Sequence, residues 1–318
     1  MRAVGFDING GPEVLRTVEL PVPEPGPGQV LIRVAYAGVN YGEVQHRLGD
    51  FGAPRGTAVP GHEVSGEIAA LGPGVTGLAV GDPVAAYLPD GGGYAEYAVA
   101  PADFSFPLDG ISLRDGGGAA LVLTTAYGVL AGAARLVAGD SVLIHAAAGG
   151  VGSVAAQIAR ALGAAAVYGT VGSSTKATYA KRFGYDAVHL RDAFVDHVPE
   201  VDVVLDPIGG PTRLASLEVL APFGRLTVYG EAARHPDLTL PVLPFWRQNR
   251  SLTGYNIGDL GRRSPATVRA HALAALSLLA SGTISLDITA ELPLTSAREA
   301  HESLQAGRNV GKTLLAVG

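Results

Sequence analysis

The sequence contains no cysteine, and this absence excludes several kinds of chemistry at once. A chain without thiols forms no disulfide and has no cysteine nucleophile. It also cannot build a zinc site on thiolates, either alone or mixed with histidine. Any catalytic or binding site must therefore be built from the remaining side chains.

Charge is also sparse, and long apolar runs of the membrane type are missing. Charged residues make up 16%, and 23 Lys and Arg against 29 Asp and Glu give a net charge of −6. A chain without clustered cations is not expected to bind nucleic acid. Two uncharged stretches, 116–134 and 141–159, are long enough to span a membrane, but Ala, Gly, Ser and Thr dominate them. They predict a buried helix and a strand–turn–helix, and with no secretory signal we expect a cytoplasmic protein without membrane association.

The order of predicted elements divides the chain into two domains. Short strands separated by Gly and Pro fill the first third, at 30–36, 64–71, 84–87 and 94–99. Apolar strands alternating with helices follow, at 142–146, 165–170, 201–206 and 224–230, which is typical of a parallel sheet. A helix at 265–281 and a strand at 312–317 end the chain. We predict an α/β protein with a β domain formed by 1–120 and 260–318, into which a nucleotide-binding domain of residues 121–259 is inserted.

The strongest motif is the run Ala146-Ala147-Ala148-Gly149-Gly150-Val151-Gly152. It lies between an apolar strand and a helix, where a dinucleotide pyrophosphate binds in doubly wound folds. Residues without a large Cβ substituent let the backbone approach the phosphates, and the helix start offers unpaired N–H groups. The alternative is a tight strand–helix turn without a ligand.

The end of the second strand of this domain predicts NADP rather than NAD. An NAD site usually has an Asp or Glu there to bind the ribose 2′-hydroxyl. Residues 168–176 contain no carboxylate, and Ser173 and Lys176 stand in that region instead. Hydroxyl and ammonium groups favour a 2′-phosphate. Alternatively, Lys176 points into solvent from the start of a helix.

Taken together, these motifs resemble the zinc-independent quinone oxidoreductases of the medium-chain dehydrogenase/reductase superfamily, the group that includes zeta-crystallin. The enoyl reductase domains of polyketide and fatty acid synthases are relatives of this group. The resemblance extends over the whole chain. Its marks are Ala37-Gly38-Val39-Asn40, Pro60-Gly61-His62-Glu63, Leu123-Thr124-Thr125-Ala126-Tyr127, the glycine-rich loop, Asp206-Pro207-Ile208-Gly209-Gly210 and Gly311-Lys312.

The resemblance implies a GroES-like β-barrel domain plus a Rossmann domain, with the active site in the cleft between them and NADPH as cofactor. It implies a homodimer and a small-molecule quinone or enone substrate. The pyrophosphate would be held by Gly149, Gly150, Val151 and Gly152, the 2′-phosphate by Ser173 and Lys176, and the nicotinamide end by Asn40, Thr124 and Asn309.

Three departures from the family pattern affect the predicted site. Asn40 stands where metal-dependent members have a catalytic cysteine, and the loop of four cysteines is missing, so we expect no metal at His62 and Glu63. Gln45 replaces a tyrosine that is common in quinone reductases, and an amide is no general acid. Arg191 lies where many members have a tyrosine, so it either contacts the 2′-phosphate or is a surface charge.

The proton donor therefore stays open in the sequence. We expect the reaction to involve Asn40, Tyr41 and Gln45, and the substrate to contact Tyr41, Gln45, Tyr127 and Tyr255. His46 is a further neighbour by motif position, and a packing role is the alternative for each aromatic residue. Glu231 stands where enoyl reductase domains have a lysine.

Three functions are compatible with these residues. The first is an NADPH-dependent, metal-independent oxidoreductase that transfers a hydride to a quinone or an α,β-unsaturated carbonyl compound. The second is a biosynthetic enoyl reductase, or a cyclase or isomerase that reuses the same scaffold, which the unusual Gln45 and Glu231 motivate. The third is a non-catalytic module that binds NADPH or RNA.

Overall fold

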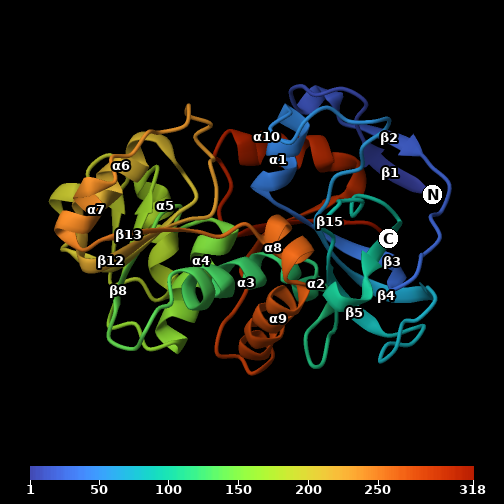
Figure 1. The fold of residues 1–318 in the computed structure, drawn as a ribbon. Helices are drawn as coiled ribbons and strands as arrows, with labels where there is room; N and C mark the ends of the chain where they lie inside the picture. The colour runs from blue at the N-terminus through green and yellow to red at the C-terminus, as the bar shows by residue number, and fades with distance from the viewer. The chain divides into compact units, whose positions relative to one another are not determined.

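The computed structural model describes residues 1–318, which form two compact units. The first unit contains Met1–Val122 and Leu286–Gly318, and the second contains Leu123–Ser285. In Figure 1 the red strand β15 (Lys312–Ala316) lies among the blue and cyan strands of the first unit. The second boundary falls at Leu286 rather than near residue 260, because α9 (Pro265–Ala280) packs against α8 (Ile257–Arg263) and against the helical segment Gly128–Ala133.

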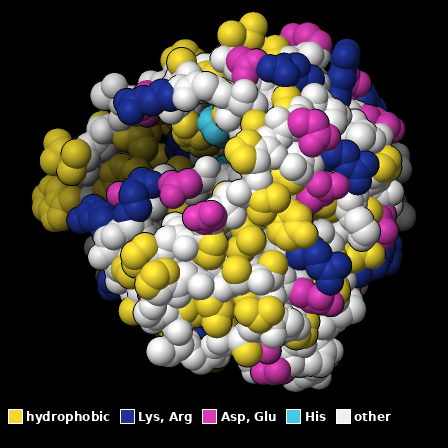
Figure 2. Space-filling model, turned by 90° about the vertical axis from the view of Figure 1, so that its right-hand side faces the viewer, with side chains coloured by type: hydrophobic (Ala, Val, Ile, Leu, Met, Phe, Trp, Pro, Cys, Tyr) yellow, Lys and Arg dark blue, Asp and Glu magenta, His cyan; other side chains and the backbone are white.

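Neither uncharged stretch forms a membrane-spanning element, and no helix in the chain is both long and apolar enough to cross a bilayer. Residues 116–134 contain α3 (Ala120–Tyr127) and the π-helix Gly128–Ala133. Residues 141–159 contain a strand, the glycine-rich loop and most of a helix, as predicted. On the face shown in Figure 2, Lys and Arg side chains are interspersed with Asp and Glu. Charge is therefore balanced locally on that face.

A seven-stranded sheet organises the first unit, with β6 pairing to β3 beside the main path. Its strands in spatial order are β14 (Ile288–Pro293), β15, β3 (Gln29–Val39), β4 (Glu63–Leu71), β5 (Pro83–Tyr87) and β7 (Ser105–Pro107), and β6 spans Tyr97–Pro101. A separate pair joins β1 (Arg2–Gly5) to β2 (Arg16–Glu19). Strand β3 is central because it pairs antiparallel with β4, β6 and β15.

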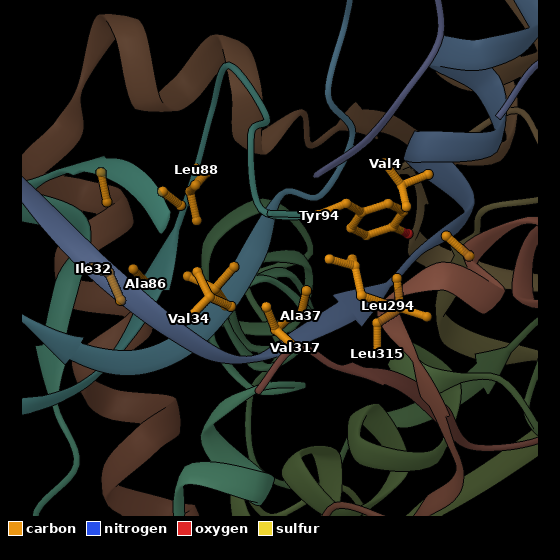
Figure 3. Close-up of a cluster of buried hydrophobic side chains, with 14 of the residues drawn as sticks. Val4, Ile32, Val34, Ala37, Ala86, Leu88, Tyr94, Leu294, Leu315 and Val317 are labelled. Carbon is orange, nitrogen blue, oxygen red and sulfur yellow. The ribbon is translucent and has the colours of Figure 1, made fainter. Parts of the chain in front are cut away.

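The core of the first unit explains why the end of the chain returns to it. Val30, Leu31, Ile32 and Val34 of β3 are buried, whereas Arg33 is exposed. Figure 3 shows Val34 in a cluster with Leu315 and other labelled residues. The last strand thus supplies core side chains that the first third of the chain lacks.

The second unit is built on a six-stranded parallel sheet in the order β10-β9-β8-β11-β12-β13. Its strands are β10 (Ala187–Leu190), β9 (Ala166–Val171), β8 (Ser141–Ile144), β11 (Val201–Asp206), β12 (Leu220–Val228) and β13 (Ser251–Gly254). Numbered within the unit, this is the 3-2-1-4-5-6 order of dinucleotide-binding folds, whose ligands bind at the carboxyl ends of the strands. The predicted doubly wound sheet is confirmed.

The helices that connect these strands place the predicted cofactor residues at that edge. They are α4 (Gly150–Ala161), α5 (Ser174–Ala180), α6 (Gly210–Glu218) and α7 (Leu243–Gln248). In the first unit, the helices near the predicted catalytic residues are α1 (Tyr41–Leu48), α2 (Leu113–Gly116) and α10 (Ala297–Gln305). Because the strands are parallel, the loops after β8, β9 and β11 open on one side of the sheet.

Candidate active site

The glycine-rich loop joins the carboxyl end of β8 to the start of α4. Ala146 adopts the left-handed backbone region at φ 55°, and Gly149 is the residue before the first helical turn. A Cβ atom at position 152 would collide with the carbonyl oxygen of Ala146, so Gly152 cannot carry a side chain. The N–H of Ala147 donates to the carbonyl oxygen of Thr170 at 3.0 Å, which ties the loop to β9.

This loop fits the pyrophosphate of a dinucleotide. The first N–H groups of a helix have no partner inside the helix, and the helix dipole favours an anion beside them. The missing side chain at Gly152 lets the backbone turn tightly at that point. The predicted pyrophosphate residues Gly149, Gly150, Val151 and Gly152 all lie at the N-terminus of α4.

Two cations meet at the carboxyl end of β9. The hydroxyl oxygen of Ser173 accepts a hydrogen bond from the backbone N–H of Lys176 and caps α5. The guanidinium of Arg191 lies 3.6 Å from the place that a Cβ atom on Gly172 would take. Burial lowers the pKa of Lys176, and the positive charge of Arg191 lowers it further. An anion bound between them would relieve this repulsion.

The structure thus brings Ser173, Lys176 and Arg191 together beside the glycine-rich loop. Lys176 and Arg191 are both half-buried, so neither side chain simply extends into solvent. A phosphate accepts several charge-assisted hydrogen bonds, and a cluster of one hydroxyl and two cations suits it. The residues present therefore fit a 2′-phosphate as well as a pyrophosphate.

A different polar network surrounds Asn40 in the first unit. The ammonium of Lys312 donates to the side-chain oxygen of Asn40 at 2.6 Å and to the carbonyl oxygen of Val39 at 3.1 Å, and it forms an ion pair with Glu63. The side-chain nitrogen of Asn40 donates to Glu63 at 3.0 Å and to Glu43 at 3.2 Å. Both ends of the amide are therefore engaged inside the protein.

The two carboxylates of this network are completely buried and well supplied with donors. Glu43 accepts from the backbone N–H of Asn40 at 2.9 Å and from that of His62 at 3.0 Å. Glu63 accepts from the backbone N–H of Leu121 at 2.8 Å. Glu43 was not predicted as a site residue, because the sequence pattern of a short helix does not distinguish a buried carboxylate from an exposed one.

His62 and Glu63, the pair that resembles part of a metal site, both have protein partners. The Nδ1 atom of His62 lies 2.9 Å from the carbonyl oxygen of Leu88, and Glu63 pairs with Lys312. The chain contains no group of three or more His, Cys, Asp or Glu side chains with the geometry to hold a metal ion.

Tyr41 and Gln45 lie one turn apart on α1, which begins directly after Asn40. Residues at i and i+4 share a face of a helix, so these two side chains are presented together. Both are half-buried, and the Gln45 amide donates to the Asp50 carboxylate at 3.3 Å. Asn309 is also half-buried and lies just before β15, in the same unit as Asn40.

Tyr127 and Tyr255 both lie beside His271 in the second unit, a histidine that no sequence motif singled out. The backbone N–H of Tyr255 donates to the carbonyl oxygen of Val228 at 2.9 Å, which places Tyr255 at the carboxyl edge of the sheet. The ring of His271 lies 5.9 Å from that of Tyr127 and 6.2 Å from that of Tyr255, between centroids. Thr124, one turn before Tyr127 on α3, is buried.

Glu231 belongs to an ion-pair chain rather than to a lysine-like site. The guanidinium of Arg213 binds the buried Asp206 at 2.7 Å and Glu231 at 2.7 Å. Asp206 also accepts from the N–H groups of Ile208 at 2.7 Å and Gly209 at 3.0 Å. These contacts fix the loops after β11 and β12, so Glu231 has a structural role here.

Comparisons with known proteins identify relatives of this chain. The family model described as the alcohol dehydrogenase GroES-like domain matches residues 26–110, and the one described as zinc-binding dehydrogenase matches residues 150–277. A quinone oxidoreductase of Pseudomonas aeruginosa is 32% identical over 99% of both chains. A 2-haloacrylate reductase of a Burkholderia species is 32% identical over 96% of both chains.

A mycocerosic acid synthase-like polyketide synthase of Mycolicibacterium smegmatis is 32% identical over 92% of this chain, which spans only 14% of that relative's length. Among solved structures, a mycobacterial protein complexed with NADPH has a TM-score of 0.92 at 31% identity and covers 99% of this chain and 100% of its own. The Escherichia coli quinone oxidoreductase complexed with NADPH has a TM-score of 0.89 at 29% identity, with 99% and 100% covered.

Proposed function

The chain belongs to the quinone oxidoreductase branch of the medium-chain dehydrogenase/reductase superfamily, and we propose that it reduces a quinone or the carbon–carbon double bond of an α,β-unsaturated carbonyl compound with NADPH. The observation that carries the proposal is the cluster of Ser173, Lys176 and Arg191 beside the glycine-rich loop. The names of the quinone oxidoreductase and 2-haloacrylate reductase relatives support both substrate classes.

The cofactor residues are assigned by their position at the edge of the parallel sheet. NADPH, when bound, supplies the hydride. The N-terminus of α4 holds the pyrophosphate, and Ser173, Lys176 and Arg191 hold the 2′-phosphate. We assign Thr124 of the second unit to the nicotinamide end, whereas Asn40 and Asn309, predicted for the same role, belong to the first unit.

The network around Asn40 limits what this residue does in the reaction. Its amide nitrogen already donates to Glu43 and Glu63, and an amide has only two N–H donors. Asn40 therefore does not stabilise negative charge on the substrate oxygen. We assign that task to the side chains of Tyr41 and Gln45 on α1, and assign Tyr127 and Tyr255 to the wall of the substrate site.

The proposed reaction needs no metal ion. Lys312 supplies a positive charge next to Asn40 and Glu63, which are the residues at the position of a metal site in the metal-dependent relatives. A hydroquinone oxygen can take its proton from water, so a quinone substrate suits a site in which Gln45 replaces an acidic hydroxyl.

We also propose that the protein is a homodimer joined at the edge of the parallel sheet. Strand β13 is the last strand of that sheet, and α7 lies just before it in the chain. Val242, Phe223 and Trp246 are 78%, 75% and 74% exposed. Large apolar side chains gathered near a free strand edge are typical of a protein–protein interface.

A second candidate function is enoyl reduction of one intermediate in a biosynthetic pathway. The match of 92% of the chain to part of a polyketide synthase favours it. The ion pair of Glu231 with Arg213 removes one reason for a cyclase or isomerase, because the unusual carboxylate has a structural role. Product identification with NADPH and a candidate enoyl thioester, against a non-reducing NADPH analogue, separates reduction from rearrangement.

The proposal is tested by following NADPH absorbance with a panel of quinones and enones. We expect oxidation above the blank with at least one compound and a lower KM for NADPH than for NADH. Binding of NADPH without oxidation by any compound would refute the catalytic proposal and favour a binding module. A gel-shift assay with RNA at low and moderate salt distinguishes an RNA-binding module, for which binding would weaken as salt rises.

A further inference from the structure

Lys312, the first residue of the C-terminal strand, is buried in the first unit with 2% of its side chain exposed. An ammonium carries three N–H donors, and three oxygen acceptors surround this one. They belong to the backbone of Val39, the amide of Asn40 and the carboxylate of Glu63. All three hydrogens of the Lys312 ammonium are therefore engaged by acceptors within the protein.

Two glycines make space for this arrangement. A Cβ atom at Gly118 would lie 2.8 Å from Cγ of Lys312, closer than such atoms approach, so the Lys312 side chain would have to move. A Cβ atom at Gly38 would collide with the carboxylate of Glu63. A larger residue at position 118 would displace the Lys312 side chain, and one at position 38 would displace the Glu63 carboxylate.

The contacts of Lys312 lead directly to the start of α1. Asn40 is the residue before this helix, and Lys312 fixes the oxygen of its side chain. The nitrogen of the same amide then points to Glu63 and to Glu43, and Glu43 accepts in turn from the backbone N–H of Asn40. The first turn of α1 is thus held by Lys312 through the Asn40 side chain and by Glu43 through the Asn40 backbone.

We propose that Lys312 is a positioning residue: its ammonium orients the Asn40 amide and sets the first turn of α1, which presents Tyr41 and Gln45. This inference rests on the proposed reductase function, in which those two side chains face the substrate. Removal of one partner of a buried ion pair leaves an uncompensated charge, so the test must separate loss of position from loss of stability.

The double variant K312M/E63Q makes that separation. In K312M the Glu63 carboxylate stays buried without its cation, so we expect a lower Tm. The additional E63Q change removes that charge and is expected to restore most of the Tm. The hydrogen bond from residue 312 to the Asn40 side-chain oxygen remains absent in the double variant. Lys181 is exposed at the end of α5, and K181M is the matched control.

Three readouts are compared: Tm, steady-state kinetics with NADPH and a quinone, and amide hydrogen exchange of residues 44–48, whose N–H groups are bonded within α1. In K312M/E63Q we expect kcat to fall about 10- to 100-fold. We expect KM for NADPH to change little, because the phosphate-binding residues lie on other elements. We expect amide exchange at 44–48 to be faster than in the wild type, and K181M to match the wild type in all three readouts.

Two results would overturn the inference. One is a double variant whose kcat stays within about twofold of the wild type. The other is unchanged amide exchange at residues 44–48, whatever happens to kcat, because it would show that Lys312 does not order α1. If the wild type reduces no compound of the panel, the proposed function fails, and hydrogen exchange still decides whether Lys312 orders α1.

Discussion

The side-chain oxygen of Asn40 accepts a hydrogen bond of 2.6 Å from the ammonium of Lys312, although 272 positions separate the two residues in the chain. This contact joins the start of α1 to the C-terminal strand. It also shows that Asn40, which stands at a metal-ligand position of related dehydrogenases, uses its amide entirely within the protein.

The two cations after β9 are expected to set cofactor preference. Each of K176A and R191A should raise the KM for NADPH by about 10-fold or more and leave the KM for NADH nearly unchanged, since a hydrogen bond to a charged group contributes about 1.5–3 kcal/mol. Steady-state kinetics with both cofactors measure this, with K181A as the exposed-lysine control. An equal rise for NADH would mean that these side chains do not bind the 2′-phosphate.

Gly152 is expected to be the least replaceable residue of the glycine-rich loop. G152A places a methyl group against the carbonyl oxygen of Ala146, so the loop must shift and NADPH binding should weaken about 10-fold or more. Gly254 has open space around its Cβ position, and G254A is the control. Fluorescence titration with NADPH gives both dissociation constants, and similar values for the two variants would contradict this reading of the loop.

The buried Asp206–Arg213 pair is expected to matter far more for stability than an exposed pair. R213A leaves Asp206 buried without its cation and should lower the free energy of unfolding by about 3–5 kcal/mol. Arg298 and Glu302 form an exposed pair on α10, and R298A should cost less than about 1 kcal/mol. Urea denaturation compares the two, and equal losses would show that Asp206 does not depend on Arg213.

His145 is expected to make stability depend on pH in the acid range. Its Nε2 atom donates to Ser216, whose hydroxyl hydrogen goes to Thr212, so Nδ1 accepts from Thr170 and carries no proton. Burial lowers the pKa of His145 from 6.5 to about 4. Between pH 6.5 and 4 the unfolded chain therefore binds more protons than the folded chain does. The free energy of unfolding falls as the pH drops through this interval, and His145 contributes about 3 kcal/mol to the fall.

Urea denaturation at several pH values between 4 and 7 tests that expectation. The free energy of unfolding of H145Q should vary less steeply with pH over this interval than that of the wild type, whatever its absolute stability. His235 is exposed, and H235Q is the control whose slope should match the wild type. An unchanged slope in H145Q would assign the acid sensitivity to other groups.

The apolar side chains near β13 are expected to hold two copies of the chain together. The wild type should sediment with the mass of two chains at micromolar concentration, and the double variant V242E/W246E with the mass of one. Ile8 is 68% exposed in the other unit, and I8E is the control that should stay dimeric. A wild-type mass of one chain would refute the proposed dimer.

Local patterns predicted much of the second unit. The strand at Val201–Asp206 was predicted with the bounds that the structure shows. Apolar strands that alternate with helices leave few arrangements other than a parallel sheet. The first unit was harder: the strand predicted at 94–99 begins at Tyr97, and β3 runs to Val39, because its long pairing with β4, β6 and β15 depends on distant residues.

The sequence by itself determined the class of this protein: the missing cysteines, the glycine-rich loop and the lack of a carboxylate after the second strand of the sheet are local features whose chemistry does not depend on distant partners. Only the tertiary structure decided what the polar residues near Asn40 do. Glu43, Glu63 and Lys312 come from three separate elements. Their charges interact strongly only in the folded protein, where burial removes water and brings the groups within hydrogen-bonding distance. Asn40, predicted from its position to act on the nicotinamide end, is held inside that network.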